Sequence, residues 1–416
     1  MNNNLSYYIF FSITFLLGLS TFLPQVRAIS YFNYIWLGLC VLWFVSVTIY
    51  EPVFFRQSSI HKILVFLFVF YILVVSYSGG GGDLGNRYLE FFQIFIFMWS
   101  YEILKNRRGI SSLLTYLKLM LPFFLFTSLT TIYAYTDAPN ISRTAKKDTL
   151  LGLQQMSSGI GGYEYIYMLS FILISLLYLI PVKCGFVRKV FLVLLISIMG
   201  VNVFLSNFST ALIIILVGAF FWFFCGRMNR PKFYFLLVVM FLLTPLIASV
   251  LVYLLQFYTS LDEGTINVSR ANEIIDFINS GVVEQSMGAR LLAFSMSLNS
   301  FSDSPIFGVI LSNSNGSVLS SIGQHSFVLD GFAMFGVFVG ALNVFLLLVP
   351  LYYLTIADRL IPISLSCSLF ILFFLFILVN NVTPSIGFAL FFIIPVILEV
   401  YKNELSKIKK TNYNIS

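Results

Sequence analysis

Residues 327–352 read FVLDGFAMFGVFVGALNVFLLLVPLY, a stretch in which Asp330 is the only charged side chain. A helix of about 20 apolar residues is long enough to cross a hydrocarbon core about 30 Å thick. A transmembrane β-barrel would instead show shorter segments of alternating hydrophobicity. This stretch therefore predicts a membrane-spanning helix and an all-α fold.

Similar apolar runs fill the rest of the chain. Of its 416 residues, 59% are hydrophobic and 10% are charged, and the mean hydropathy is +0.94, which is far more apolar than a soluble domain of this size. We therefore expect residues 1–416 to form a single integral membrane domain, a polytopic bundle of about 12 transmembrane helices. These are predicted near residues 5–23, 31–49, 62–78, 88–104, 113–134, 163–182, 189–206, 209–226, 233–258, 327–352, 361–379 and 386–401.

Basic residues favour one orientation of this bundle. With both termini in the cytoplasm, most of the 24 Lys and Arg residues fall in cytoplasmic loops, as the positive-inside rule requires. The net charge of +7 comes mostly from this bias, so it gives no reason to expect a nucleic-acid partner.

Two outer loops are much longer than the others, the first over residues 136–162 and the second over residues 259–326. A loop as long as the second one is usually functional and has structure of its own. Within it, residues 272–278 and 290–301 carry apolar side chains at helical spacing, which predicts amphipathic helices on the outer surface of the bundle. The outer segment GGGGDLGNR at 79–87 is too rich in glycine to be helical. It is interpreted as a flexible turn, and a loop that binds phosphate through its backbone amides is the less favoured alternative.

His325 is the candidate general base. It ends the second long loop, immediately before the helix predicted at 327–352, and so lies at the mouth of the bundle. An imidazole can accept a proton near neutral pH. The other histidine, His61, lies beside Lys62 at the cytoplasmic start of a predicted helix and is interpreted as an interfacial residue.

Arg143, Arg270 and Arg290 are the candidate binding residues, and all three lie in the two long outer loops. A guanidinium group stays ionised and can bind phosphate oxygens through two parallel hydrogen bonds, which suits a diphosphate at a membrane surface. The alternative for each arginine is contact with a lipid headgroup or an ordinary surface ion pair. Lys146 and Lys147 follow Arg143 closely.

No metal or cofactor is expected. The outer face offers one histidine and no cysteine, and its acidic residues show no ligand spacing. The sequence also lacks nucleotide-binding and Ser-His-Asp motifs. An enzyme of this kind would draw its energy from its substrate.

The stretch from Gly288 to Gly340 combines three motifs: an arginine that opens a surface helix, a Ser-Pro-Ile-Phe-Gly turn, and a His-Ser pair before a helix with spaced glycines. They are Arg290, residues 304–308, and His325-Ser326. The combination resembles the signature of the O-antigen polymerase and ligase superfamily. Polymerases of this group carry, in each long outer loop, an arginine at a fixed distance before a glycine. Here fifteen residues separate Arg143 from Gly159, and ten separate Arg270 from Gly281.

One position departs from the family pattern. Relatives often carry an arginine at the start of the helix that follows a short outer turn, but this chain reads LSNFSTALIIIL at 205–216, with Ser209 at that place. If that arginine binds diphosphate in relatives, Arg143 or Arg270 would have to supply the charge here.

The resemblance implies a GT-C-like glycosyltransferase of the bacterial inner membrane, with its active site facing the periplasm. It would be an O-antigen or surface-polysaccharide polymerase, an inverting and metal-independent enzyme. It would transfer the growing glycan from undecaprenyl diphosphate to the non-reducing end of another undecaprenyl-diphosphate-linked repeat unit. His325 would deprotonate the acceptor, Arg270 and Arg290 would bind the diphosphate, and Arg143 would position donor or acceptor. Implied partners are undecaprenyl-diphosphate-linked oligosaccharides, membrane lipid and a chain-length regulator protein.

Two alternatives stay open at this point. An O-antigen ligase, which transfers finished polymer to lipid A core, shares the fold and the histidine, although the paired loop arginines favour the polymerase. A flippase or other transporter of lipid-linked oligosaccharides would show internal repeats and ionisable groups lining a mid-membrane cavity. The sequence indicates neither feature.

Overall fold

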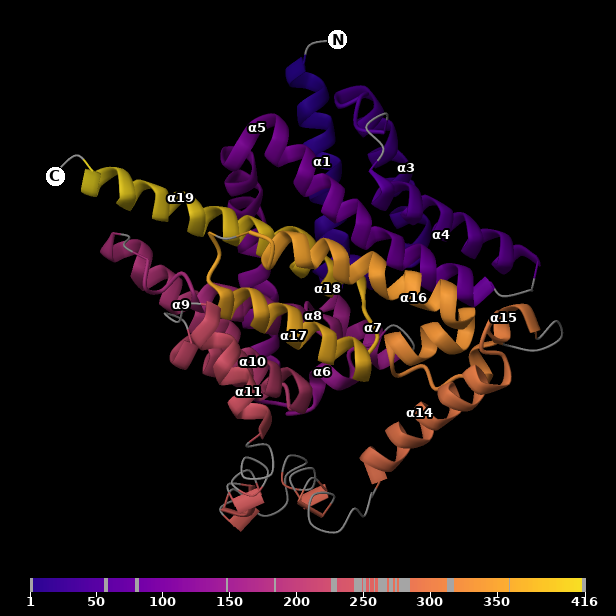
Figure 1. Ribbon diagram of the computed structural model, residues 1–416. Helices are drawn as coiled ribbons and strands as arrows, with labels where there is room; N and C mark the ends of the chain where they lie inside the picture. Colours follow the sequence, from indigo (N-terminus) through magenta and orange to yellow (C-terminus); the bar gives the residue numbers. More distant parts are fainter. Residues whose placement is uncertain are drawn as a thin grey trace.

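A computed structural model describes residues 3–55, 59–78, 82–146, 149–182, 185–225, 230–242, scattered positions between 249 and 276, and residues 285–312, 318–358 and 360–413. Over these residues the chain folds into α-helices with a few short 3₁₀ and π segments, and it contains no strand (Figure 1). The all-α class predicted from the apolar runs is therefore confirmed.

Several helices are suited to a membrane. Within the described residues, six are long and apolar enough to cross one: α1 (Asn3–Phe22), α3 (Phe32–Tyr50), α5 (Gly82–Ala134), α9 (Phe186–Leu205), α16 (Phe327–Thr355) and the C-terminal series α18 (Pro384–Phe388), η2 (Ala389–Ile393) and α19 (Ile394–Tyr413). Shorter apolar helices are α4 (Ile60–Ser78), α8 (Tyr163–Leu177), α10 (Ser209–Cys225) and α17 (Ile363–Val379). The protein is thus a helical membrane protein, and the total of twelve spans stays a prediction. The span expected over 233–258 is described only as α11 (Arg230–Leu242) and a few later positions.

Helix α5 contains two of the predicted spans, 88–104 and 113–134. It has 53 residues, and at Gly109 the backbone leaves helical geometry with φ 67° and ψ −160°. A straight helix of this length would measure about 80 Å, far more than the hydrocarbon thickness of a bilayer. Glycine adopts a positive φ at little steric cost, so the chain turns there and α5 forms two arms (Figure 1).

The first arm of α5 also corrects one expectation. It begins at Gly82, so residues 82–87 are helical, and the prediction that the 79–87 segment is too rich in glycine for a helix was wrong over this part. Residues 79–81 lie outside the described residues. A helix that enters lipid must satisfy its backbone hydrogen bonds within its own segment, which favours helix over the low intrinsic propensity of glycine.

Aromatic side chains form much of the core between α1, α5 and the C-terminal helices. The rings of Phe22 and Phe124 stack with centroids 4.1 Å apart, and the ring centroids of Tyr116 and Phe392 are 4.4 Å apart. Residues Pro384–Leu398 are buried almost throughout. A helix that is apolar on all sides is stable in the interior of a bundle, so the C-terminal series forms a central element of the fold.

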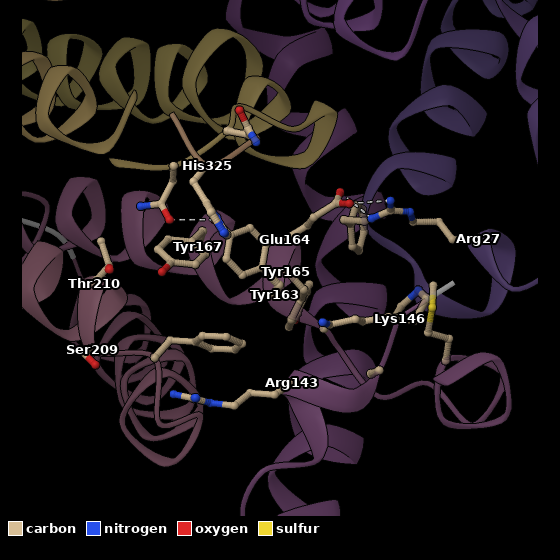
Figure 2. A pocket seen from close by; sticks show the side chains of 18 of the residues that line it. Arg27, Arg143, Lys146, Tyr163, Glu164, Tyr165, Tyr167, Ser209, Thr210 and His325 are labelled. Atoms are coloured by element: carbon tan, nitrogen blue, oxygen red, sulfur yellow. Dashed lines mark hydrogen bonds and ion pairs between the residues drawn. The ribbon is translucent and has the colours of Figure 1, made fainter. Parts of the chain in front are cut away.

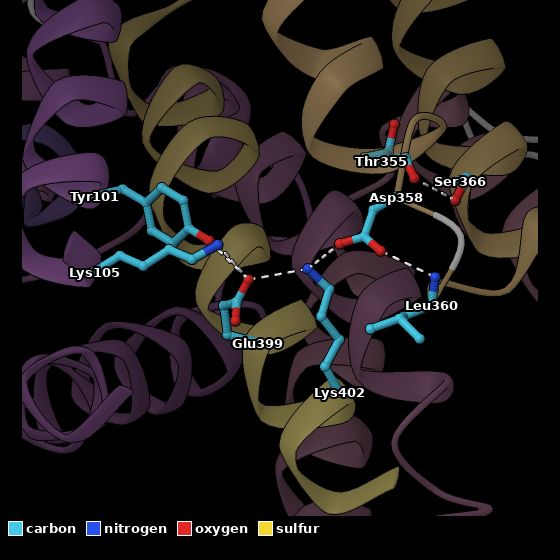
Figure 3. Close-up of polar contacts among 8 residues, drawn as sticks. All are labelled: Tyr101, Lys105, Thr355, Asp358, Leu360, Ser366, Glu399 and Lys402. Atoms are coloured by element: carbon cyan, nitrogen blue, oxygen red, sulfur yellow. Dashed lines mark hydrogen bonds and ion pairs between the residues drawn. The ribbon is translucent and has the colours of Figure 1, made fainter. Parts of the chain in front are cut away.

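At one end of the bundle, ion pairs join α5 and α19 to the segment after α16 (Figure 3). Lys105 Nζ lies 2.7 Å from Glu399 Oε1, Lys402 Nζ lies 3.0 Å from the same oxygen, and Lys402 also pairs with Asp358. Desolvation alone raises the pKa of Asp358, but hydrogen bonds from Lys402 and the Leu360 amide outweigh it, so this pKa lies below its ordinary value. We call this the basic end of the bundle.

The Ser-Pro-Ile-Phe-Gly turn at residues 304–308 packs into a break in α16. The break lies at Gly336, which has φ 72°, and a Cβ there would lie 2.1 Å from the carbonyl oxygen of Ile306. Reciprocally, a Cβ on Gly308, which has φ 70°, would lie 2.1 Å from the carbonyl oxygen of Met334. Both the backbone conformation and the close approach require glycine, so the turn and the helix break form one interlocking contact.

Replacing Gly336 by alanine should therefore destabilise the protein strongly. A left-handed backbone on a non-glycine residue costs about 1–3 kcal/mol, and the overlap with Ile306 adds about as much. We expect a clearly lower unfolding temperature of the purified protein in detergent. Gly38 of α3 is the matched control, because nothing lies within 4 Å of an added Cβ there. A G336A variant as stable as G38A would contradict the steric argument.

The second long loop packs on the bundle through α14 (Gln285–Asp303), α15 (Val309–Ser312) and the 3₁₀ turn η1 (Val318–Ser321). The segment predicted to be helical at 290–301 lies within α14. This helix contacts α16, with Ala293, Ser297 and Ser300 buried while Leu292 and Leu298 are exposed. Of the other predicted helix, at 272–278, residues 272, 273, 275 and 276 are helical, and the remaining three lie outside the described residues.

Candidate functional site

A cavity of about 660 Å³ opens at the end of the bundle opposite the basic end. The C-terminal end of α1, α2 (Pro24–Arg27), α6 (Ile141–Thr144), α7 (Leu150–Ser157) and the starts of α8 and α10 contribute to its wall. Arg290 of α14, the segment before α16 and the segment after α17 complete it. Figure 2 shows the side chains that surround this cavity.

Three of the four predicted site residues meet at this cavity. Arg143, Arg290 and His325 all line it, although they come from α6, α14 and the segment before α16. The fourth, Arg270, lies outside the described residues. The fold therefore brings the two long loops, far apart in sequence, to a common space.

The segment that carries His325 is held at both ends. Gln324, on one side, has φ 57°, and its carbonyl oxygen accepts a hydrogen bond of 2.6 Å from Asn381 Nδ2. On the other side, Ser326 is the N-cap of α16 and accepts a hydrogen bond of 3.1 Å from the Leu329 amide. An N-cap of this kind stabilises a helix start by about 1 kcal/mol. His325 itself is exposed, so its ring is accessible from the cavity.

Asp330 connects the His325 segment to α14. Its side chain is 2% exposed and accepts hydrogen bonds from Ser297 Oγ at 2.7 Å and from the Ser326 amide at 3.2 Å. Ser297 Oγ in turn accepts a hydrogen bond of 2.9 Å from the Gly323 amide. A buried carboxylate is stable only when such partners satisfy it, and this network fixes the helix of Arg290 relative to His325.

Arg143 is directed toward the start of α10. Its Nη2 donates a hydrogen bond to the carbonyl oxygen of Asn207, and its guanidinium lies 5.2 Å from the centroid of the Phe208 ring. An arginine at this distance from an aromatic face gains a cation–π attraction. Ser209, at the place where the family resemblance locates an arginine, lines the same cavity (Figure 2). Arg143 thus supplies a positive charge beside the Ser209 position.

Cationic side chains outnumber carboxylates in the described cavity wall. Arg27 and Lys146 join Arg143 and Arg290 there, and Glu164 is the one carboxylate among the described residues that line it. A low-dielectric cavity lined by one sign of charge concentrates ligands of the opposite charge. The cavity therefore suits an anionic ligand, and arginine side chains suit phosphate oxygens in particular.

Aromatic and neutral polar groups complete the wall. Tyr163 donates a hydrogen bond of 3.1 Å to Asn380 Oδ1. Its ring centroid lies 4.5 Å from that of Tyr167 and 5.7 Å from that of Phe208. Aromatic rings beside oriented polar groups are typical of a site for an organic ligand.

Glu164 and Asn380 also line the cavity but were not among the predicted site residues. Glu164 lies in the first turn of the apolar helix α8, and an ionisable group beside so apolar a run could have been a signal. Asn380 carried no such signal, because an asparagine after an apolar helix is a common way to end one. Within the described parts of the chain, no group of three or more His, Cys, Asp or Glu side chains could hold a metal ion.

The fold and this cavity define the class of the protein: a helical membrane protein with a cationic, aromatic-walled cavity at one end of its bundle. No family model matches the chain, and no curated protein matches it significantly.

Proposed function

We propose that this protein is a surface-polysaccharide repeat-unit polymerase, an inverting and metal-independent glycosyltransferase of GT-C type. One observation carries the proposal: His325, Arg143 and Arg290 line a single cavity of about 660 Å³. A base and several fixed cations are what a transfer from a lipid diphosphate to a sugar hydroxyl needs. A transporter would not need a base beside these cations.

In the proposed reaction, the arginines bind the diphosphate of the undecaprenyl-linked donor. His325 accepts the proton of the attacking hydroxyl at the non-reducing end of the acceptor repeat unit. The new bond forms between that oxygen and the anomeric carbon, while the bond from this carbon to the diphosphate oxygen breaks. Undecaprenyl diphosphate leaves with the electron pair, and the single displacement inverts the anomeric configuration. Arg143 and Arg290 stabilise the charge that develops on the leaving group.

The proposed location is the bacterial inner membrane, with both termini in the cytoplasm and the cavity facing the periplasm. The excess of Lys and Arg residues in the predicted cytoplasmic loops supports this orientation. Lys105, Lys402, Arg107 and Arg108 gather at the basic end, where Arg107 pairs with Glu51 and Arg108 donates a hydrogen bond of 2.9 Å to Asn4. Basic residues favour the cytoplasmic side of a membrane protein.

Deletion of the gene tests the function directly. We expect gel analysis of surface polysaccharide to show single repeat units and no ladder of longer chains, with the ladder restored by a plasmid copy. Undecaprenyl-linked single repeats should accumulate at the same time. A ligase would instead leave long polymer on the lipid carrier, and a flippase would leave single repeats inaccessible from the periplasm. Either result would contradict the polymerase proposal.

A further inference from the structure

The carboxylate in the cavity wall is engaged by one particular arginine. Arg27 Nη1 lies 2.5 Å from Glu164 Oε2, and Arg27 Nη2 lies 2.7 Å from Glu164 Oε1. This is the two-bond geometry that guanidinium and carboxylate groups prefer. The charges of the pair cancel, so this part of the wall is polar but close to neutral.

The Arg27–Glu164 pair is held in place by neighbouring groups but is not fully buried. Ser385, fully buried at the start of α18, has its Oγ 2.7 Å from the carbonyl oxygen of Thr21 and 3.1 Å from Glu164 Oε2, so the two acceptors share its single hydroxyl hydrogen. The side chains of Arg27 and Glu164 keep 15% and 23% of their surface exposed. Both residues line the cavity, so a bound ligand can reach the pair.

This neutral part of the wall differs from the part that carries Arg143. Figure 2 shows the Arg27–Glu164 pair across the cavity from Ser209 and Thr210, toward which Arg143 extends. Because its charges cancel, the pair offers a phosphate no net attraction. Sugar hydroxyls suit the pair, because a carboxylate accepts hydrogen bonds from hydroxyl groups and a guanidinium donates hydrogen bonds to their oxygens.

Tyr163 adds an apolar surface next to this pair. It precedes Glu164 in the chain, lines the same cavity, and has its hydroxyl fixed by Asn380. The C–H face of a pyranose ring packs well against such an aromatic ring. The cavity thus has separate surfaces for the two parts of a glycosyl diphosphate.

We infer that Arg27, Glu164 and Tyr163 form a glycan subsite, which binds the hydroxyls and ring face of the sugar attached to the diphosphate. The inference rests on the proposed function and adds that one part of the cavity wall binds the diphosphate and another binds the sugar. Arg143 and Arg290 hold the diphosphate, and the Arg27–Glu164 pair recognises the sugar. Recognition of the glycan is therefore separable by mutation from recognition of the lipid diphosphate.

Binding of two lipids to the purified full-length protein tests this division. The probes are undecaprenyl diphosphate without a sugar, and the lipid-linked oligosaccharide extracted from the deletion strain. We expect the wild-type protein to bind the glycosylated lipid more tightly than the bare lipid. Glu164→Gln should weaken binding of the glycosylated lipid about tenfold, as expected for the loss of a hydrogen bond to a charged group, without weakening binding of the bare lipid.

Two further variants control for structural effects. Arg27→Lys keeps the ion pair but loses the two parallel donors of the guanidinium. It should therefore weaken binding of the glycosylated lipid and not that of the bare lipid. If Glu164→Gln fails to fold, Arg27→Lys tests the glycan subsite in its place. Glu399→Gln removes an ion pair of similar length, Lys105–Glu399 at 2.7 Å, from the basic end. It should change neither affinity. Unfolding temperatures of all variants identify any general loss of structure.

The possible failures are distinguishable. Equal losses for both lipids in Glu164→Gln, or no loss for either, would overturn the glycan subsite while leaving the proposed function intact. If the deletion strain accumulates no lipid-linked oligosaccharide, or if the wild-type protein does not bind bare undecaprenyl diphosphate, the proposed function fails and the subsite fails with it.

Discussion

Replacing His325 by alanine is expected to abolish the polymer ladder while single repeat units remain on the lipid carrier. A general base contributes about 10²–10⁴-fold to the rate of such a reaction, so the remaining activity would fall below what a gel detects. The side chain is exposed at the cavity, and substitutions at exposed positions usually change stability by less than about 0.5 kcal/mol. The amount of protein in the membrane should therefore stay normal.

The only other histidine provides a matched control. His61 lies in α4, where its Nε2 is 3.1 Å from the carbonyl oxygen of Leu346, away from the cavity wall. His61→Ala should leave the distribution of chain lengths unchanged, provided that immunoblotting shows equal protein. A normal ladder from the His325→Ala strain would remove this residue from the mechanism.

Replacing Arg143 by glutamine should reduce polymer formation by about 10²–10³-fold, the effect typical of removing one group that stabilises transition-state charge. Lysine should rescue poorly at this position, because a point charge cannot reproduce two parallel hydrogen bonds. The measurement is the rate at which purified protein extends lipid-linked repeat units. Arg108→Gln at the basic end, which removes a 2.9 Å hydrogen bond to Asn4, should retain the wild-type rate.

A second substitution makes this prediction sharper. Because Arg143 lies beside the Ser209 position, Ser209→Arg should restore part of the activity lost in Arg143→Gln by returning a guanidinium to the start of α10. The same Ser209→Arg change in the wild-type background should help little, since the cavity already holds Arg143. A double variant as inactive as Arg143→Gln alone would show that the charge of Arg143 cannot be supplied from α10.

The helical content of this protein was predictable because lipid makes helix formation a local property. An unpaired backbone group costs several kcal/mol in hydrocarbon, so an apolar run of sufficient length is enough to predict a helix. The residues at which the helices begin and end were less predictable. Gly109 joins two predicted spans into the two arms of α5, and the glycines from Gly82 onward became helical by continuity with the membrane segment.

The site was predictable in part, and for a related reason. Ionisable side chains are rare in this chain, so His325, Arg143 and Arg290 stood out in the outer loops, and all three line the cavity. Their spacing along the chain gave no indication of which of them would meet. The roles proposed for them stay predictions.

The sequence by itself therefore determined the membrane environment, the helical class and the short set of polar residues available for chemistry, because each follows from local composition. Only the tertiary structure decided which of these residues act together. Arg27 and Glu164 are 137 positions apart, and Arg143 meets the start of α10 across 64 positions. Such pairs depend on how α2, α6, α8 and α10 pack, and packing is a property of the whole bundle that no single segment encodes.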